Sequence, residues 1–235
     1  MGYTVANYII ERLTEQGIDT LFGVPSVYCA RLYDAANSAA FKTIVTSSDL
    51  EAGYAADGYA RVRGLSAVAV SYGPGTLSLV NAIAGAYVER SPIVVINGGP
   101  SKGNIDDQQA TGVVFSHSIG KAHTDLDVFT PVTAFCERIN DVGLVRAKID
   151  TAIRTALTRK LPVYLEIPQA MLGAICTPPS GKLDLTIQPG DAAQVADMIL
   201  KAIAKSNSPF LIVGVEVQRY GLASDVLAII DKLKI

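Results

Sequence analysis

The sequence predicts an α/β fold, a doubly wound parallel sheet with helices on both faces, followed by an incomplete second α/β domain. Two features indicate this fold. Short runs rich in Val and Ile alternate with segments of helix length, and Gly, Pro or Ser bounds each interval. In addition, 49% of the 235 residues are hydrophobic and 18% are charged, as expected where both faces of a sheet are covered.

The first half of the chain supplies four pairs of helices and strands. Apolar residues recur at helical spacing from Val5 to Ile18, we expect Gly17 as the C-cap, and "TLFGVP" (20–25) follows as a short buried strand. Further helices and strands then alternate. We expect helices at 28–38, 50–63 and 76–89, and strands at 42–46, 66–71 and 92–97.

The second half completes this domain and begins another. After a loop-rich stretch from Gly98 to about Thr124, the first domain closes at residue 174, and a linker rich in Pro and Gly spans 175–190. The segment 191–235 is the first part of a further α/β domain, too short to close a core of its own. We expect strands at 132–139, 162–168 and 209–217, and helices near 141–158, 191–205 and 222–233.

Composition and charge exclude several classes of function. The 20 basic and 22 acidic residues are scattered along the chain, which disfavours a nucleic-acid partner. The longest apolar runs have strand length, far below the roughly 18 residues of a membrane-spanning helix, and the N-terminus shows no secretory signal, so we expect a cytoplasmic location. Cys29, Cys136 and Cys176 match neither a disulfide framework nor a zinc site, so we expect no metal ligands in this chain.

Five motifs follow one another along the chain. They are "FGVPS" (22–26), "AADGYAR" (55–61), "GPG" (73–75), "SHSIGK" (116–121) and "PVYLEIP" (162–168). With this ordered set the chain resembles the thiamine-diphosphate-dependent 2-oxo acid decarboxylases and acetolactate-synthase-like enzymes. The resemblance assigns residues 1–174 to the N-terminal domain that binds the pyrimidine ring, and it implies thiamine diphosphate as the cofactor and a 2-oxo acid as the substrate.

Two carboxylates compete for the first catalytic role. In the family, a glutamate eight positions before the Asp of "DGYAR" hydrogen-bonds the pyrimidine ring and activates the cofactor, and that position is Asp49 here. Glu51 would point about 200° away on a helix, so only one of the two can face the pocket. Because aspartate reaches about 1.5 Å less far, either the backbone lies closer or activation is weaker. The alternative is that Asp49 only caps a helix beginning at Leu50.

The resemblance also assigns residues to the cofactor pocket, where missing side chains permit a close approach of the ring. The alternative for this stretch, a tight turn that starts a helix, is compatible with that role. The implied cofactor-binding residues are Pro25, Ser26, Gly73, Pro74, Gly75 and Thr76.

Two further segments depart from the decarboxylase pattern. Ser26 and Val27 stand where that branch has Gly and then Asp, and Ser116 stands where it has the first of two adjacent histidines. We assign Val27 and Ser116 to the substrate pocket, which leaves His117 as the second catalytic residue, with a surface or structural imidazole as the alternative. Because two groups that could protonate an intermediate are missing, ligation to a carbonyl acceptor is favoured over simple decarboxylation.

No Gly-Asp-Gly motif followed by an Asn pair, which carries the diphosphate and Mg²⁺ in the family, occurs in the sequence. We therefore expect a second polypeptide that supplies the diphosphate-binding domain and most of the Mg²⁺ ligands, in a split enzyme assembled as a heterotetramer. A truncated chain, a simple non-oxidative decarboxylase and a non-catalytic cofactor-binding or regulatory homologue are the alternatives.

Overall fold

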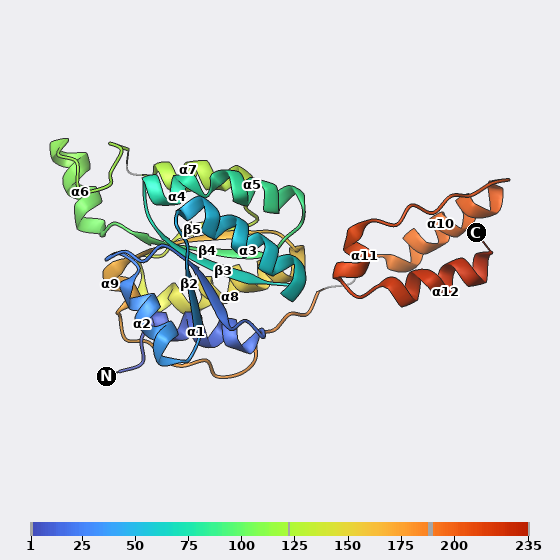
Figure 1. Cartoon of the computed structure of the whole chain (residues 1–235), viewed down its shortest axis with the longest axis horizontal. Coiled ribbons are helices and arrows are strands. Elements are labelled where there is room, and N and C mark those ends of the chain that lie inside the picture. Colours follow the sequence, from blue (N-terminus) through green and yellow to red (C-terminus); the bar gives the residue numbers. More distant parts are fainter. Residues whose placement is uncertain (1, 122, 188–189, 235) are drawn as a thin grey trace. The chain divides into compact units, whose positions relative to one another are not determined.

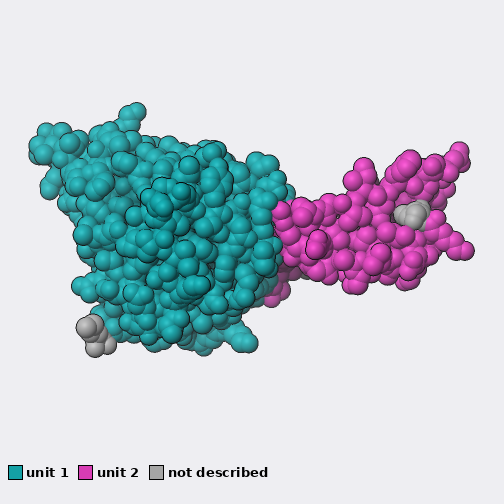
Figure 2. All heavy atoms as spheres, viewed as in Figure 1, with its two compact units in different colours: residues 1–185 teal, residues 186–235 magenta. Residues whose placement is uncertain are grey.

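The computed structural model of the chain describes residues 2–121, 123–187 and 190–234. The chain divides into two units, residues 1–185 and residues 186–235, which are coloured separately in Figure 2. The first unit extends beyond residue 174, where the sequence places the end of the first domain. The reason is local pairing: the backbone N–H of Cys176 donates to the carbonyl of Tyr3, and Ile175 forms an antiparallel bridge with Thr4.

The first unit is built on a parallel sheet, which confirms the predicted fold class. Within its described residues the sheet has six strands in the order β2-β1-β3-β4-β6-β5, and each neighbouring pair is parallel. The strands are β1 (Thr20–Gly23), β2 (Lys42–Val45), β3 (Ser66–Ser71), β4 (Ile93–Gly99), β5 (Cys136–Arg138) and β6 (Val163–Pro168). β3, β4 and β6 are buried almost throughout, as expected for central strands covered on both faces.

Helices cover both faces of the sheet (Figure 1). One face carries α1 (Val5–Glu15), α2 (Ala30–Ser38) and α8 (Val142–Arg159), and the other carries α3 (Asp49–Arg63), α5 (Val80–Val88) and α7 (Thr124–Phe129). Residues along each strand alternate between the two cores, because successive strand side chains point to opposite faces. In β3, for example, Ala67 and Ala69 face the first core while Val68 and Val70 face the second.

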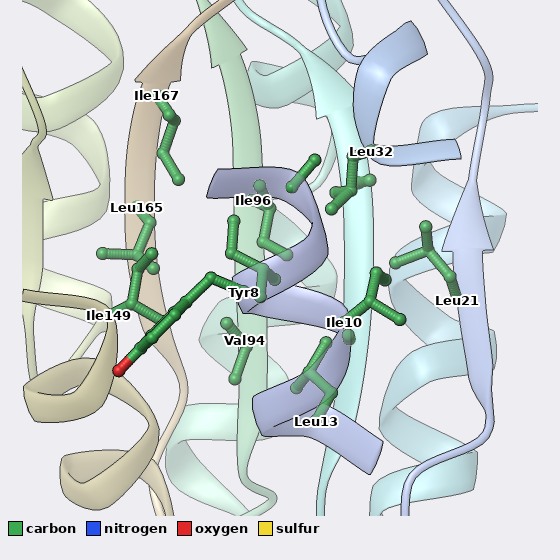
Figure 3. Packing of buried hydrophobic residues seen from close by; sticks show 14 of the residues in the cluster. Tyr8, Ile10, Leu13, Leu21, Leu32, Val94, Ile96, Ile149, Leu165 and Ile167 are labelled. Carbon is green, nitrogen blue, oxygen red and sulfur yellow. The ribbon is translucent and has the colours of Figure 1, made fainter. Parts of the chain in front are cut away.

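The larger core lies between the sheet and α1 (Figure 3). Tyr8, Ile10 and Leu13 of α1 are at most 2% exposed and pack with strand residues such as Leu21 and Ile96. Thr4 is the N-cap of this helix: its hydroxyl accepts the N–H of Asn7, and the Asn7 side chain accepts the N–H of Thr4. This packing holds α1 against the sheet.

Several elements of the first unit differ from the sequence prediction. The helix expected at 76–89 is divided into α4 (Pro74–Ser78) and α5. The loop-rich stretch contains α6 (Lys102–Thr111), which Ser101 caps; of its residues only Ile105 and Gln108 are buried, so it carries almost no apolar periodicity. The strand expected at 132–139 is only β5, because η1 (Thr130–Val132) precedes it. A short helix α9 (Gln169–Leu172) follows β6.

The second unit is helical in its described residues. It contains α10 (Ala192–Lys205), α11 (Val215–Arg219) and α12 (Ala223–Leu233). The strand predicted at 209–217 is wrong, because a strand needs a neighbour for its backbone groups and no described residue of this unit offers one. The apolar run stays exposed instead, with Phe210 at 90% and Ile212 at 93%. In the part of the chain that is described, no helix is long and apolar enough to cross a membrane.

Candidate active site

The strand order creates a topological switch point between β1 and β3. The chain passes from β1 outward to β2, then returns to β3 beside β1 and continues to β4 in the other direction. Loops that follow neighbouring parallel strands meet at the carboxyl edge of the sheet, and at a switch point they leave a crevice between them. The loop after β1 carries Pro25, Ser26 and Val27, the loop after β2 leads to Asp49, and the loop after β3 carries the turn 72–75.

Asp49 is the first residue of α3, and its carboxylate faces the turn that follows β3. Ser48 is the N-cap of α3, because its hydroxyl accepts the N–H of Glu51 at 3.3 Å. A Cβ placed on Gly75 would lie 3.3 Å from Oδ2 of Asp49. The Asp49 carboxylate therefore lies next to the backbone of a residue that has no side chain. Asp49 is half-buried whereas Glu51 is exposed. Burial raises the pKa of Asp49 above its ordinary value.

The turn 72–75 has a shape that only glycine allows at its second position. Gly73 has φ +72° and ψ −129°, and a Cβ there would lie 2.3 Å from the backbone oxygen of His117. Pro74 opens α4 and is exposed, while Thr76 is buried and donates its hydroxyl proton to the carbonyl of Ser71 at 2.7 Å. The turn therefore presents bare backbone both to Asp49 and to the segment that carries His117.

His117 lies beside this turn on an exposed segment. Its backbone is left-handed, with φ +66°, and its ring lies edge-on to the rings of Tyr28 and Tyr72 at centroid distances of 5.9 Å and 6.0 Å. Nδ1 of His117 is 3.0 Å from Oγ of Ser116, which is also exposed. The Tyr72 hydroxyl donates to the backbone oxygen of Ser116 and ties this segment to the turn.

The loop after β1 lies next to the same tyrosines. Tyr28 packs edge-on against Tyr72 at a centroid distance of 4.9 Å. Ser26 is half-buried and its hydroxyl lies 3.3 Å from Sγ of Cys29. Pro25 is exposed, and the apolar side chain of Val27 is 66% exposed.

The structure thus brings the two predicted catalytic residues to one turn. Asp49 lies against Gly75 and His117 lies against Gly73. Ser26, Val27 and Ser116 lie on the two segments that flank Tyr28 and Tyr72, rather than in direct contact with the Asp49 carboxylate. The arrangement places one carboxylate and one imidazole beside a turn that carries no side chain at Gly73 or Gly75.

A buried polar network behind the turn was missed by the sequence prediction. Oδ2 of Asp125, on α7, accepts the N–H of Gly73 at 2.7 Å and the side-chain amide of Asn97 at 3.1 Å. The same Asn97 amide donates to the hydroxyl of Tyr164, which is fully buried on β6. Burial raises the pKa of Asp125, although the hydrogen bonds from Gly73 and Asn97 oppose this shift.

The network continues to an ion pair in the neighbouring strands. Glu166 on β6 is 1% exposed, and Nε of Arg138 on β5 donates to its Oε1 at 2.6 Å. Burial raises the pKa of Glu166 to about 7, and the guanidinium of Arg138 only partly offsets this effect. A signal for this residue does exist in the sequence, since Glu166 is a lone charge inside the apolar strand run "VYLEIP".

A small cavity connects this network with the exposed segment. It has a volume of about 20 Å³, enough for one water molecule, and is lined by residues that include Tyr72, His117, Asp125, Arg138 and Glu166. Across the described ranges, no group of three or more His, Cys, Asp or Glu side chains is arranged to hold a metal ion. The carboxyl and imidazole groups of this site can carry acid and base chemistry.

Comparison with known proteins identifies the family. Residues 3–120 match the family described as thiamine pyrophosphate enzyme, N-terminal TPP binding domain. The chain is 34% identical over 233 residues to an indole-3-pyruvate decarboxylase of Azospirillum brasilense. This alignment covers 97% of this chain and 42% of that protein. It is 32% identical over 239 residues to a pyruvate decarboxylase of Hanseniaspora uvarum, covering 97% and 41%. The chain therefore spans about two fifths of the length of these relatives.

Proposed function

Because the chain belongs to the thiamine pyrophosphate enzyme family and contains its N-terminal domain, we propose that it is one subunit of a thiamine-diphosphate-dependent enzyme that decarboxylates a 2-oxo acid and ligates the product to a carbonyl acceptor. One observation carries the proposal. The half-buried Asp49 carboxylate faces the bare backbone of Gly75 at the switch point of the sheet. This is where an α/β sheet of this kind binds its ligand.

The residues present suit the pyrimidine ring by their chemistry, because a half-buried carboxylate can hold or share a proton at a ring nitrogen. Without side chains at Gly73 and Gly75, the turn lies directly against the backbone of His117 and the carboxylate of Asp49, and the proposal places the edge of the ring at this carboxylate. Under this proposal Asp49 would hydrogen-bond a ring nitrogen. Thr76 and the backbone of Pro25, Ser26, Gly73 and Pro74 would line the ring.

Asp49 and His117 have different tasks in the proposed reaction. Thiamine diphosphate, when bound, would supply a nucleophilic carbon for the 2-oxo group and a sink for the electron pair of the C–C bond that breaks when CO2 leaves. Asp49, whose pKa is raised by burial, holds or shares a proton at the ring nitrogen. His117 moves a proton at the exposed edge of the site, and Val27 and Ser116 contact the substrate.

Simple non-oxidative decarboxylation is the second candidate, and one observation favours it: the relatives carry the name of decarboxylases. Ligation is supported by the apolar, 66% exposed Val27 and by Ser116, neither of which can deliver a proton as a carboxyl or imidazole group would. Product analysis separates the two. Ligation predicts that an added aldehyde is incorporated into the product, whereas aldehyde release at the same rate with and without the acceptor contradicts ligation.

The proposal includes a second polypeptide that carries the diphosphate-binding domain and holds the diphosphate through Mg²⁺, in a heterotetramer with a cytoplasmic location. Co-purification of the untagged chain from its native host tests it, with mass spectrometry of the companion and quantification of bound thiamine diphosphate. A companion at equal stoichiometry together with bound cofactor is the expected result. A chain that runs alone and binds no cofactor contradicts the split-enzyme proposal.

The role of Asp49 is tested in that complex. Asp49→Asn should lower turnover of a 2-oxo acid by at least about 100-fold, the usual contribution of a positioned acid or base, while the complex and its unfolding temperature are retained. Glu51→Gln, which removes an exposed carboxylate from the same helical turn, is the matched control and should retain activity. Normal turnover by Asp49→Asn would remove Asp49 from the mechanism and favour the non-catalytic alternative for this chain.

A further inference from the structure

Asp125 is a buried carboxylate that the proposed reaction does not use. It lies in the first turn of α7 and is 8% exposed. Its Oδ2 accepts two hydrogen bonds, one from the backbone N–H of Gly73 and one from the side-chain amide of Asn97. A buried carboxylate is costly unless donors satisfy it, so its place here is defined by these partners.

The Gly73 N–H is the point at which Asp125 meets the candidate site. Gly73 is the second residue of the turn 72–75, whose last residue, Gly75, faces Asp49, and its own α-carbon lies against the backbone of His117. A displacement of Gly73 would therefore change the surroundings of both catalytic residues together. Proton transfer is sensitive to displacements of about 1 Å.

The Asp125 carboxylate and its helix are held in place by residues of the central strands. Asn97 of β4, which donates to Asp125, also donates to the hydroxyl of Tyr164 on β6. The ring of Tyr164 stacks on Phe129 of α7, with centroids 4.6 Å apart and an interplanar angle of 17°. Both ends of α7 are thus fixed to the central strands, and Asp125 is attached to a rigid part of the fold.

We infer that Asp125 is a positioning residue: its carboxylate holds the turn 72–75 from behind, and so sets the approach of Gly75 to Asp49 and of Gly73 to His117. The use of this geometry in catalysis rests on the proposed function. The hydrogen bond and its effect on the turn are properties of this chain alone.

Three variants of the full chain test the inference. Asp125→Ala removes the acceptor, Asp125→Asn keeps an acceptor oxygen without the charge, and Asp127→Ala removes an exposed aspartate from the same helix as a matched control. The measurement is amide hydrogen exchange by NMR for Gly73, with the amide of Val95 in the centre of β4 as the reference for global opening. The ratio of the Gly73 exchange rate to the Val95 exchange rate separates local opening of the turn from global unfolding.

Asp125→Ala should raise the ratio by about 10- to 100-fold, as expected for loss of a hydrogen bond to a charged acceptor. Asp125→Asn should restore most of the protection, and Asp127→Ala should leave the ratio unchanged. A second readout is the pKa of the Asp49 carboxyl, measured by ¹³C chemical shift. It should fall toward its ordinary value in Asp125→Ala, because water enters as Gly75 moves away, and stay raised in Asp127→Ala.

An unchanged Gly73 ratio in a folded Asp125→Ala chain would overturn the inference, as would a ratio raised equally by the control. If Asp125→Ala does not fold, Asp125→Asn decides alone: a Gly73 ratio raised a few-fold supports the inference, and a wild-type ratio overturns it. These readouts need neither cofactor nor partner. A failed cofactor-binding or turnover experiment would therefore contradict the proposed function without altering this result.

Discussion

Asp49 and Glu51 lie in the same turn of α3 but in different surroundings. The Asp49 carboxylate is half-buried against the turn at Gly75, and the Glu51 carboxylate is exposed. Both are favoured by the helix dipole at this end. The half-buried Asp49 loses water on folding, and this raises the pKa of its carboxyl.

This difference predicts a pH-dependent effect on stability. Because the folded pKa of Asp49 is above its unfolded value, the folded state binds more protons in the window between the two values, and the free energy of unfolding falls as pH rises through it. At pH 7 Asp49→Asn should therefore be more stable than Glu51→Gln, since both lose the dipole interaction of about 0.3–1 kcal/mol and only Asp49→Asn relieves the burial of a charge.

Thermal unfolding of the two variants between pH 3 and pH 7 measures this difference. It should shrink as pH falls below the ordinary range of carboxyl groups, roughly pH 4, where Asp49 is protonated in both states. Equal unfolding temperatures of the two variants at every pH would contradict the prediction.

Single residues were predictable where a motif or a charge within an apolar run marks them. Counting back from "DGYAR" by the family pattern predicts Asp49, and the structure places its carboxylate beside Gly75. Its catalytic role stays a prediction. Asp125 has no such mark, because it lies in a polar stretch and only the fold carries it to Gly73, 52 positions away in the sequence. Contacts of that kind depend on tertiary structure and leave no local pattern.

At the scale of elements, the packing of α3 on α5 requires a missing side chain. A Cβ on Gly53 would lie 2.7 Å from Cβ of Ala82 and 2.8 Å from Cδ2 of Leu79, closer than carbon atoms can approach. Gly58 lies in the same helix but is exposed, and a Cβ there would meet nothing within 4 Å. The two glycines share their helical conformation and differ in their neighbours.

Alanine at these two positions should therefore change stability in opposite directions. Gly53→Ala should lower the free energy of unfolding by about 1–3 kcal/mol, because it overpacks the interface. Gly58→Ala should raise it by about 0.5–1 kcal/mol, because alanine loses less conformational freedom in a helix. Urea unfolding followed by circular dichroism measures both, and a stabilising Gly53→Ala would show that α3 and α5 can separate without cost.

Elements were predictable where apolar residues recur with a clear period. The alternation of strands and helices in the first unit gives the correct fold class, because a buried parallel sheet needs apolar runs separated by amphipathic helices. α6 lacks that signal, having only two buried residues. The run at 209–217 has the signal of a strand but no neighbouring strand in the described residues of its unit, so part of it forms α11 instead.

At the scale of the whole chain, one arginine joins segments that are distant in sequence. Arg12 of α1 is 5% exposed, and its Nε and Nη2 donate to the two carboxylate oxygens of Asp150 on α8 at 2.8 Å and 3.0 Å. Its Nη1 donates to Glu15 at 2.6 Å and to the backbone oxygen of Gly181 at 2.7 Å. Glu15 in turn accepts the N–H of Leu183 at 2.5 Å. These bonds explain why residues expected to form a linker belong to the first unit.

Arg12→Met should lower the free energy of unfolding by about 2–4 kcal/mol. Breaking a buried pair costs about 3–5 kcal/mol, and the side chains of Asp150 and Glu15 keep 28% and 20% of their exposure, which screens part of this cost. Arg63→Met is the matched control, since Arg63 also donates to a backbone carbonyl, that of Gly17, but its side chain is 49% exposed. The control should cost less than about 1 kcal/mol.

Acid should weaken the attachment of residues 181–183 to α1 in the wild-type chain, and it should have less effect in Arg12→Met. Burial alone would raise the pKa of Glu15, but hydrogen bonds from Leu183 and Arg12 outweigh it and lower the pKa. The stability that Glu15 contributes is therefore complete above its unfolded pKa and is lost as pH falls through its folded pKa. Trypsin cleavage after Lys182 reports the release of the segment, and it should be faster in Arg12→Met than in Arg63→Met at neutral pH. Equal cleavage rates in the two variants would show that Arg12 does not hold residues 181–183 against α1.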